Sequence, residues 1–168
     1  MSIYELAKSI RETNQKNGFD CPSWDNLPNK VMFAVTELDE GMDAITGDGD
    51  DPLSEELADT AVRILDVLYA VWGNDWADRT AGILNIHPEG VFQPGEVILW
   101  KPLRLLCKAV ECWRHENKAD TRIALEMALR EVFAIGALIG HDLHVDIEWK
   151  NAKNATRGRL HGKARSEG

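Results

Sequence analysis

The sequence predicts an all-α protein, and three of its features support this prediction. Apolar residues recur every three or four positions over most of the chain, which is the spacing that lines one face of a helix. No segment alternates apolar and polar residues for long enough to indicate a strand. The segments between the periodic stretches are rich in Gly, Pro and Asp, which begin or end helices.

The length and composition are typical of one helical domain that covers residues 1–168. A chain of 168 residues can bury a sizeable core, and 44% hydrophobic with 28% charged residues is ordinary for a globular protein. We expect helices at residues 2–16, 28–46, 53–72, 97–116, 120–139 and 143–155. Short connections between consecutive helices favour an antiparallel helical bundle.

The first three helices are separated by clear breaks. The opening segment MSIYELAKSIRETNQ is amphipathic and carries acids, so we expect a first helix rather than a secretory signal. The loop at 17–27 contains Gly, Pro and Asp, and the turn GDGDDP at 47–52 ends one helix at Gly47 and begins the next near Pro52. Apolar seams follow the second helix (Val31, Val35, Leu38, Met42, Ile45) and the third (Leu57, Ala61, Ile64, Leu65, Leu68, Trp72).

The second half of the chain has the pattern of a degenerate internal repeat. Sliding the sequence by 67 positions places 31–75 on 98–142, and both segments show a helix, a short turn, a second helix and a Gly stop. The expected organisation is a catalytic helical hairpin at 17–73, a degenerate repeat at 97–140 and a basic tail at 141–168. A four-helix core would then have one half that carries acidic residues and one that supports it.

The charge of the chain is uneven. The net charge is −9, yet six of the 19 Lys and Arg residues lie from Lys150 onward with a single acid among them. An acidic body repels phosphates, which argues against a nucleic-acid polymer as partner. The basic tail has two interpretations, a solvated chain end or a clamp for a small polyphosphate.

The sequence also indicates where the protein works. No apolar run approaches the length of a membrane span, so we expect no membrane partner. The three cysteines (Cys21, Cys107, Cys112) are odd in number and lack the spacing of a metal site, which is typical of a reducing compartment such as the cytoplasm.

Two acidic pairs are the strongest candidates for chemistry. Glu37 and Glu40 are three apart on the second predicted helix, and Glu56 and Asp59 are three apart on the third. Residues three apart on a helix project to one side, so antiparallel packing would bring four carboxylates together. Such hard oxygen ligands suit Mg²⁺, with Mn²⁺ as a substitute. The alternative is that these acids belong to solvated helix faces.

These residues resemble the signature of a known family. The segment VTELDEGMDAITG, followed by EELADTAVRILD fifteen residues after Glu40, looks like the E-x-x-E…E-x-x-D signature of MazG-like all-α nucleoside triphosphate pyrophosphohydrolases. The tail WKNAKNATRGRLHGK is similar to the K-x-x-x-N-x-x-R…H-G-K ending of many of these proteins. The chain departs from their simple members because residues 74–139 intervene, which makes it similar to single-chain forms such as the dimeric dUTPases.

The resemblance implies Mg²⁺-dependent hydrolysis of a (deoxy)nucleoside triphosphate to the monophosphate and pyrophosphate. It assigns the metal to Glu37, Glu40, Glu56 and Asp59, with Glu37 or Glu40 as general base. It assigns the phosphates to Lys150, Asn154 and Arg157 of the tail.

Three further expectations leave alternatives open. Phe19, Trp24 and Asn29 would form a base pocket before the second helix, or Phe19 and Trp24 would only hold the first helix on the bundle. The chain would pair as a homo-oligomer through helix faces, or the internal repeat would already supply both halves. A catalytically inactive helical binding or regulatory protein of the same fold is the alternative function.

Overall fold

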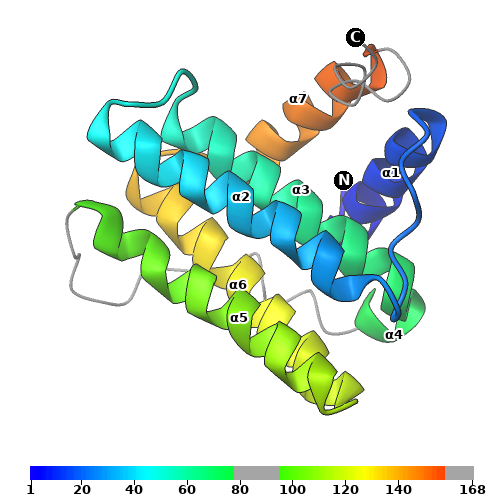
Figure 1. The fold of residues 1–168 in the computed structure, drawn as a ribbon. Helices are drawn as coiled ribbons and strands as arrows, with labels where there is room; N and C mark the ends of the chain where they lie inside the picture. The colour runs from blue at the N-terminus through cyan, green and yellow to red at the C-terminus, as the bar shows by residue number, and fades with distance from the viewer. Residues whose placement is uncertain (78–94, 158–168) are drawn as a thin grey trace, which may run out of the picture.

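The structure of the protein is a computed structural model that describes residues 1–77 and 95–157. Within these ranges the chain is helical and contains no strand, which confirms the predicted all-α bundle (Figure 1). The elements are α1 (Ile3–Lys16), α2 (Leu27–Thr46), α3 (Leu53–Trp72), α4 (Asn74–Ala77), the 3-10 helix η2 (Gly95–Leu99), α5 (Trp100–Arg114), α6 (Lys118–Leu138) and α7 (Leu143–Ala155).

The helix bounds follow the sequence closely, with two differences. The helix predicted at 97–116 starts as the 3-10 turn η2 and becomes α-helical only at Trp100. The short helix α4 follows Gly73 directly and was not expected. Residues 78–94, which precede η2, lie outside the described residues.

Local signals explain where the helices that carry the site begin and end. Ser2 and Glu5 form a reciprocal capping box at the start of α1, which satisfies otherwise unpaired backbone amides. Helix α2 ends at Gly47, whose φ of 86° is a left-handed conformation that glycine adopts without strain. Pro52 then precedes α3, and Ser54 lies inside its first turn rather than at the cap.

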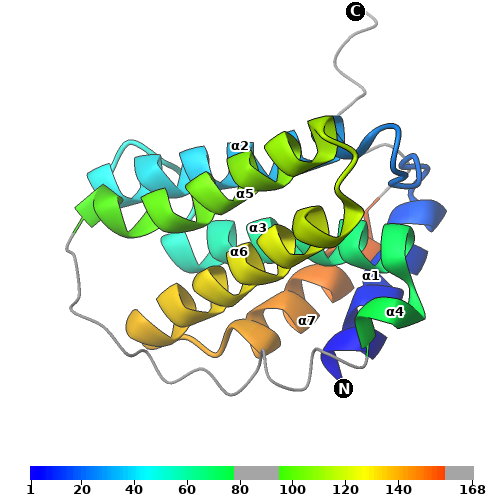
Figure 2. The same ribbon diagram turned by 90° about the horizontal axis from the view of Figure 1, so that it is seen from below.

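The helices stack in three layers, which Figure 2 shows edge-on: α2 with α5, α3 with α6, and α1 with α7. Helix α3 is central because it packs against α1, α2, α6 and α7. The hairpin α2–α3 packs against the hairpin α5–α6. The first helices of the two hairpins, α2 and α5, contact each other, and so do the second helices, α3 and α6. This arrangement is the one expected from an internal duplication, which stays a prediction.

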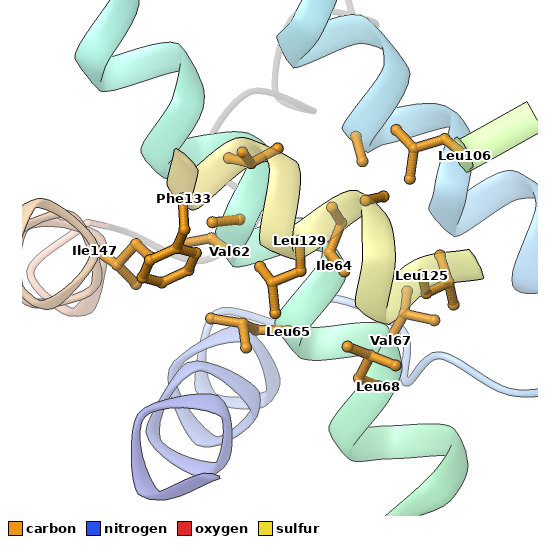
Figure 3. Packing of buried hydrophobic residues seen from close by; sticks show 14 of the residues in the cluster. Val62, Ile64, Leu65, Val67, Leu68, Leu106, Leu125, Leu129, Phe133 and Ile147 are labelled. Carbon is orange, nitrogen blue, oxygen red and sulfur yellow. The ribbon is translucent and has the colours of Figure 1, made fainter. Parts of the chain in front are cut away.

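The core lies around α3, and Figure 3 shows its centre. Apolar side chains from four helices meet there: Val62, Ile64, Leu65, Val67 and Leu68 from α3, Leu106 from α5, Leu125, Leu129 and Phe133 from α6, and Ile147 from α7. The apolar seam predicted for the third helix is buried except at Trp72, which is partly buried. Because α3 is covered on nearly every side, charged residues on it that point inward are held in a dry environment.

All five residues of the apolar seam predicted for α2 belong to the core or pack against it. Val31 and Leu38 are buried, whereas Val35, Met42 and Ile45 are partly buried. The buried face also contains Ala34, Glu37 and Gly41. The reason is that α2 packs against both α3 and α5, so a wider arc of its surface is covered than one seam provides.

Two further features concern membrane-spanning helices and cysteines. Among the described residues, no helix is long and apolar enough to cross a membrane. Cys21 and Cys107 are exposed, Cys112 is buried, and all three are free thiols.

Candidate metal centre

The two acidic pairs of the sequence face each other across the antiparallel helices α2 and α3. Gly41 on α2 allows this close approach. A Cβ atom at Gly41 would lie 3.3 Å from the side chains of both Leu53 and Leu99, and 3.6 Å from the Cβ of Glu56. The absence of a side chain at Gly41 therefore leaves room for the Leu53 and Leu99 side chains, which pack against α2 beside Glu56.

Three of the four predicted metal ligands converge. One carboxylate oxygen from each of Glu37, Glu56 and Asp59 lies within 4.8 Å of the others. Glu37 is 8% exposed and Glu56 is 5% exposed, while Asp59 is half-buried. The prediction that these acids lie on solvated helix faces is therefore wrong for Glu37 and Glu56.

Glu40, the fourth predicted ligand, lies at the edge of this cluster. Its side chain is exposed and is not one of the three that converge. It is nevertheless close enough for its charge to act on Glu56, whose pKa it helps to raise. Glu40 therefore lies between the buried carboxylates and solvent.

Two of the three converging carboxylates have a basic partner. Arg63, one turn along α3 from Asp59, donates from Nε and from Nη2 to Glu37 Oε1, each at 2.9 Å. Lys150 of α7 places its Nζ 2.6 Å from Asp59 Oδ2. Glu56 differs from both, because its Oε2 is buried and has no hydrogen-bond partner within the part of the chain that the structure describes.

The pKa values of the cluster reflect this crowding. Burial, followed by the charges of Glu40, Asp59 and Glu37, raises the pKa of Glu56 to about 8. Burial also raises the pKa of Glu37, although the Arg63 charge opposes the rise. For Lys150, hydrogen bonds from its ammonium to Asp59 and Glu55 outweigh the effect of burial and raise its pKa. The lysine is therefore held charged and Glu56 resists ionisation.

These residues fit a hard divalent cation. Carboxylate oxygens are the ligands that Mg²⁺ and Mn²⁺ prefer, and three that come from two rigid helices are held in place by the bundle. A buried carboxylate oxygen without a partner is costly, and a cation at this point would remove that cost. The oxygen ligands and the unpartnered Glu56 Oε2 therefore both fit a divalent cation such as Mg²⁺.

The tail residues predicted to bind phosphate have different positions. Lys150 lies at the cluster and is 4% exposed. Asn154 lies one turn further along α7, where its backbone carbonyl accepts a hydrogen bond from Asn17 Nδ2 at 2.9 Å. Arg157 is half-buried just after α7. The remainder of the predicted basic tail, from 158 onward, lies outside the described residues.

Sequence reasoning did not single out Glu55, which organises the basic side of the site. Its Oε1 accepts hydrogen bonds from Lys150 Nζ at 2.6 Å and from Lys153 Nζ at 2.9 Å. These bonds lower the pKa of Glu55. Lysines three apart on one predicted helix were a signal that one acid would pair with both, but only the packing of α7 on α3 identifies that acid.

Of the three residues predicted for a base pocket, Phe19 alone lines a hollow next to the cluster. The hollow also contains Phe33, Arg63 and Asp66, and the Arg63 guanidinium lies 5.6 Å from the centre of the Phe33 ring. Arg63 therefore links the hollow to the carboxylates, since it also binds Glu37.

The other two predicted pocket residues lie elsewhere. Asn29 is exposed and does not line the hollow. The Trp24 ring packs against Trp72 and Trp113, with centroids 6.3 and 6.5 Å away, and Trp113 Nε1 donates to the Trp24 carbonyl oxygen at 2.7 Å. Trp24 thus fastens the loop before α2 to α3 and α5.

Phe19 has a structural role as well. Its carbonyl oxygen accepts a hydrogen bond from Arg11 Nη2 of α1, and Arg11 also pairs with the buried carboxylate of Asp66. The loop before α2 is therefore tied to α1 and α3 by one arginine.

Comparisons with protein-family models, with curated proteins and with solved structures give no match to this chain. The candidate site is accordingly defined by its geometry and its donor atoms.

Proposed function

We propose that this protein is a Mg²⁺-dependent nucleoside triphosphate pyrophosphohydrolase of the MazG-like kind, with Mn²⁺ as a substitute ion. One observation carries the proposal: oxygens of Glu37, Glu56 and Asp59 converge to within 4.8 Å, with Glu56 Oε2 buried and unpartnered. Gathering carboxyl groups in this way destabilises the fold through mutual repulsion and loss of hydration, and a bound cation would offset that cost.

The residues of the site divide by charge. Glu37, Glu56 and Asp59 would hold the cation, and exposed Glu40 would complete the ligand set from the solvent side. A bound divalent cation would neutralise phosphate charge and lower the pKa of a water. Glu37 or Glu40 would take the proton of the attacking water, because both are next to the cluster and Glu40 is open to solvent.

The basic residues of α7 would bind the triphosphate. Lys150 supplies a point charge beside the carboxylates, and Arg157 supplies a planar guanidinium that can bind two phosphate oxygens. Asn154 lies between them along the chain and would donate from its amide. The hollow lined by Phe19 and Phe33 would receive the base, since aromatic faces stack on any base.

A specific observation favours a second candidate, a catalytically inactive binding or regulatory protein of the same fold. Arg63 and Lys150 already neutralise Glu37 and Asp59. A purely structural ion network would look similar, and such networks also perturb pKa values. The unpartnered Glu56 is the feature that this candidate does not explain.

Incubating the protein with each (d)NTP and Mg²⁺ tests the proposal. Pyrophosphate and a nucleoside monophosphate are expected, and Glu56→Gln should lower turnover by at least about 100-fold, because it removes a cation ligand while keeping the side-chain shape. Asp39→Asn is the matched control, since Asp39 is an exposed acid on α2 outside the cluster. Release of orthophosphate would indicate a different bond cleaved, and no product from any nucleotide would favour the inactive candidate.

We also propose that the protein works in a reducing compartment such as the cytoplasm. Two states of assembly are considered, a monomer and a homo-oligomer. The three free cysteines are compatible with that setting. Both hairpins come from one chain, so a monomer would contain a complete bundle, while a homo-oligomer through helix faces is the alternative. Light scattering distinguishes the two states.

A further inference from the structure

Lys150 is the most deeply buried lysine side chain among the residues that the structure describes, and it is held by two acids. Its Nζ lies 2.6 Å from Asp59 Oδ2 and 2.6 Å from Glu55 Oε1. The residue as a whole is 4% exposed. The ammonium group therefore lies at the edge of the carboxylate cluster, in hydrogen-bond contact with one of its three acids.

This position has a consequence for any cation in the cluster. Asp59 is one of the three converging acids and is also the partner of Lys150. An ammonium and a divalent ion that share one carboxylate repel each other strongly at such a distance, and the repulsion is weakly screened in a buried site. The ion pair between Lys150 and Asp59 therefore weakens the binding of a divalent cation to Asp59, and a bound cation weakens the ion pair.

The two basic side chains at the cluster do not satisfy all of its carboxylate oxygens. With Arg63 on Glu37 and Lys150 on Asp59, Glu56 Oε2 still has no partner. Glu56 is more than nine-tenths buried, so the unpartnered oxygen is not compensated by water at an open surface. The Arg63 and Lys150 side chains thus leave Glu56 Oε2 without a hydrogen-bond partner.

We propose that Lys150 is a removable internal counter-ion, which closes the cluster in the metal-free protein and leaves Asp59 when a divalent cation binds. This inference rests on the proposed function, because the cation site is the same. Glu55 keeps Lys150 beside the cluster after the exchange, since it holds the ammonium independently of Asp59. Once released from Asp59, the Lys150 ammonium can donate a hydrogen bond to an anion bound next to the cation.

Lys153 supplies a matched control on the same helix. Its Nζ binds Glu55 Oε1 at 2.9 Å and stacks over the Trp149 ring at 4.7 Å, and Glu55 is not one of the three converging acids. Lys153 therefore has the same charge and a shared partner, but within the described residues it forms no hydrogen bond or ion pair with Glu37, Glu56 or Asp59. Its removal changes the charge near the site without freeing Asp59.

The experiment measures Mn²⁺ binding by electron paramagnetic resonance in the full chain without nucleotide. Lys150→Met should tighten Mn²⁺ binding by about tenfold or more relative to wild type, because a full charge next to Asp59 is lost. Lys153→Met should change binding by less than about threefold, because its charge is exposed to solvent screening. Lys150→Gln also removes the charge, but with a polar side chain, and should tighten Mn²⁺ binding in the same way. Circular dichroism checks that each variant is folded.

A thermal measurement supplies a second readout. Without metal, Lys150→Met should melt below wild type, since Asp59 loses its partner, and saturating Mn²⁺ should raise its melting temperature by more than it raises that of wild type. Lys153→Met should show the wild-type increment.

The outcomes separate this inference from the proposed function. If wild type binds Mn²⁺ but both Lys150 variants bind it equally or more weakly, the counter-ion role is overturned and the metal site stands. If the tightening is equal for Lys150→Met and Lys153→Met, the effect is general charge and the inference is also overturned. If no variant and no wild-type protein binds Mn²⁺, the metal site fails and the inference fails with it.

Discussion

At the scale of single residues, Glu56 is the most informative side chain of the protein. It is buried, carries an oxygen without a partner and is surrounded by Glu37, Glu40 and Asp59. Its raised pKa follows from burial first and from those neighbouring charges second. Glu37 and Asp59 have basic partners, so Glu56 is the one converging acid without a basic partner, and its raised pKa keeps it protonated near neutral pH.

The raised pKa of Glu56 predicts how the metal-free protein responds to pH. The folded chain keeps the proton up to about pH 8, whereas the ordinary pKa of a glutamate side chain is 4.5. Because the folded state binds the proton more tightly than the unfolded state, stability falls as pH rises from about 4.5 to about 8 and the loss is complete above that range. Glu56→Gln carries no such charge, so in EDTA its melting temperature should rise relative to wild type as pH increases.

The measurement compares melting temperatures of wild type and Glu56→Gln in EDTA at pH 5.5 and pH 8.5, and the variant should gain relative to wild type at the higher pH. Asp39→Asn is the control, because Asp39 is exposed and outside the cluster. A constant difference between wild type and Glu56→Gln at both pH values would contradict the assigned burial of this carboxyl group.

At the scale of elements, the contact between α2 and α3 sets the geometry of the cluster. Glu37 comes from α2, while Glu56 and Asp59 come from α3. Their oxygens can converge only if the two helices are close, and Gly41 is the point where α2 offers no side chain. Helix α7 completes the site from the other side by packing Lys150 against α3.

The Gly41 position predicts a mutation that acts on the site through helix packing. Gly41→Val would place a branched side chain where even a Cβ lies 3.3 Å from the side chains of Leu53 and Leu99. Overpacking of this kind costs about 1–3 kcal/mol. We expect a lower melting temperature and weaker Mn²⁺ binding, because α2 and α3 must separate.

Gly41→Ala separates the effect of bulk from that of glycine itself. Alanine adds one carbon whose tightest contacts, at 3.3 Å, are with the ends of two flexible leucine side chains, and it favours a helix by up to about 1 kcal/mol over glycine. Its melting temperature should therefore lie well above that of Gly41→Val. Equal Mn²⁺ affinity in Gly41→Val and wild type would show that the helix separation does not control the site.

At the scale of the whole molecule, the bundle supplies a stable frame for a destabilising site. The core around α3 joins side chains of α3, α5, α6 and α7, so the second hairpin contributes burial although it lacks the carboxylate set (Figure 3). Under the 67-residue shift, the positions equivalent to the four predicted metal ligands are Arg104, Cys107, Ile123 and Glu126. The second hairpin therefore has a supporting role in the proposed function.

Metal binding should stabilise the whole fold. A ligand that binds only the folded state at 100 times its dissociation constant adds about 2.7 kcal/mol. For a protein of this size we expect Mg²⁺ to raise the melting temperature by several degrees, and EDTA to reverse the effect. The measurement is a thermal melt with and without MgCl₂ at matched ionic strength, with Glu56→Gln as a variant that should show little shift. An equal shift in both proteins would assign the stabilisation to another part of the chain.

Much of the fold could be predicted because its signals are local. The helices at α1, α2, α3 and α7 follow from apolar spacing and from Ser2, Gly47 and Pro52, which act within one turn of the chain. The 3-10 start of the helix at Trp100 and the short helix α4 were missed, because few local signals distinguish one turn of helix from a turn.

The candidate site was predicted in part. The pairing of acids three apart on adjacent antiparallel helices indicated Glu37, Glu56 and Asp59, and these converge. Glu40 was placed in the site by its spacing on α2, and Trp24 by its position just before α2. Neither signal reports where the side chain lies in the folded chain: Glu40 is exposed at the edge of the cluster, and the Trp24 ring packs against Trp72 and Trp113.

By itself the sequence determined the helical class, the order of the helices and the acids available to bind a cation, because these depend on neighbours within a few residues. Only the tertiary structure decided that Glu56 has a buried oxygen without a partner, that Arg63 binds Glu37, and that Lys150 is held between Asp59 and Glu55. Residues 55 and 150 are 95 positions apart. The physical reason is that burial and electrostatic pairing depend on distances in space, which packing of α7 against α3 sets and local sequence patterns do not contain.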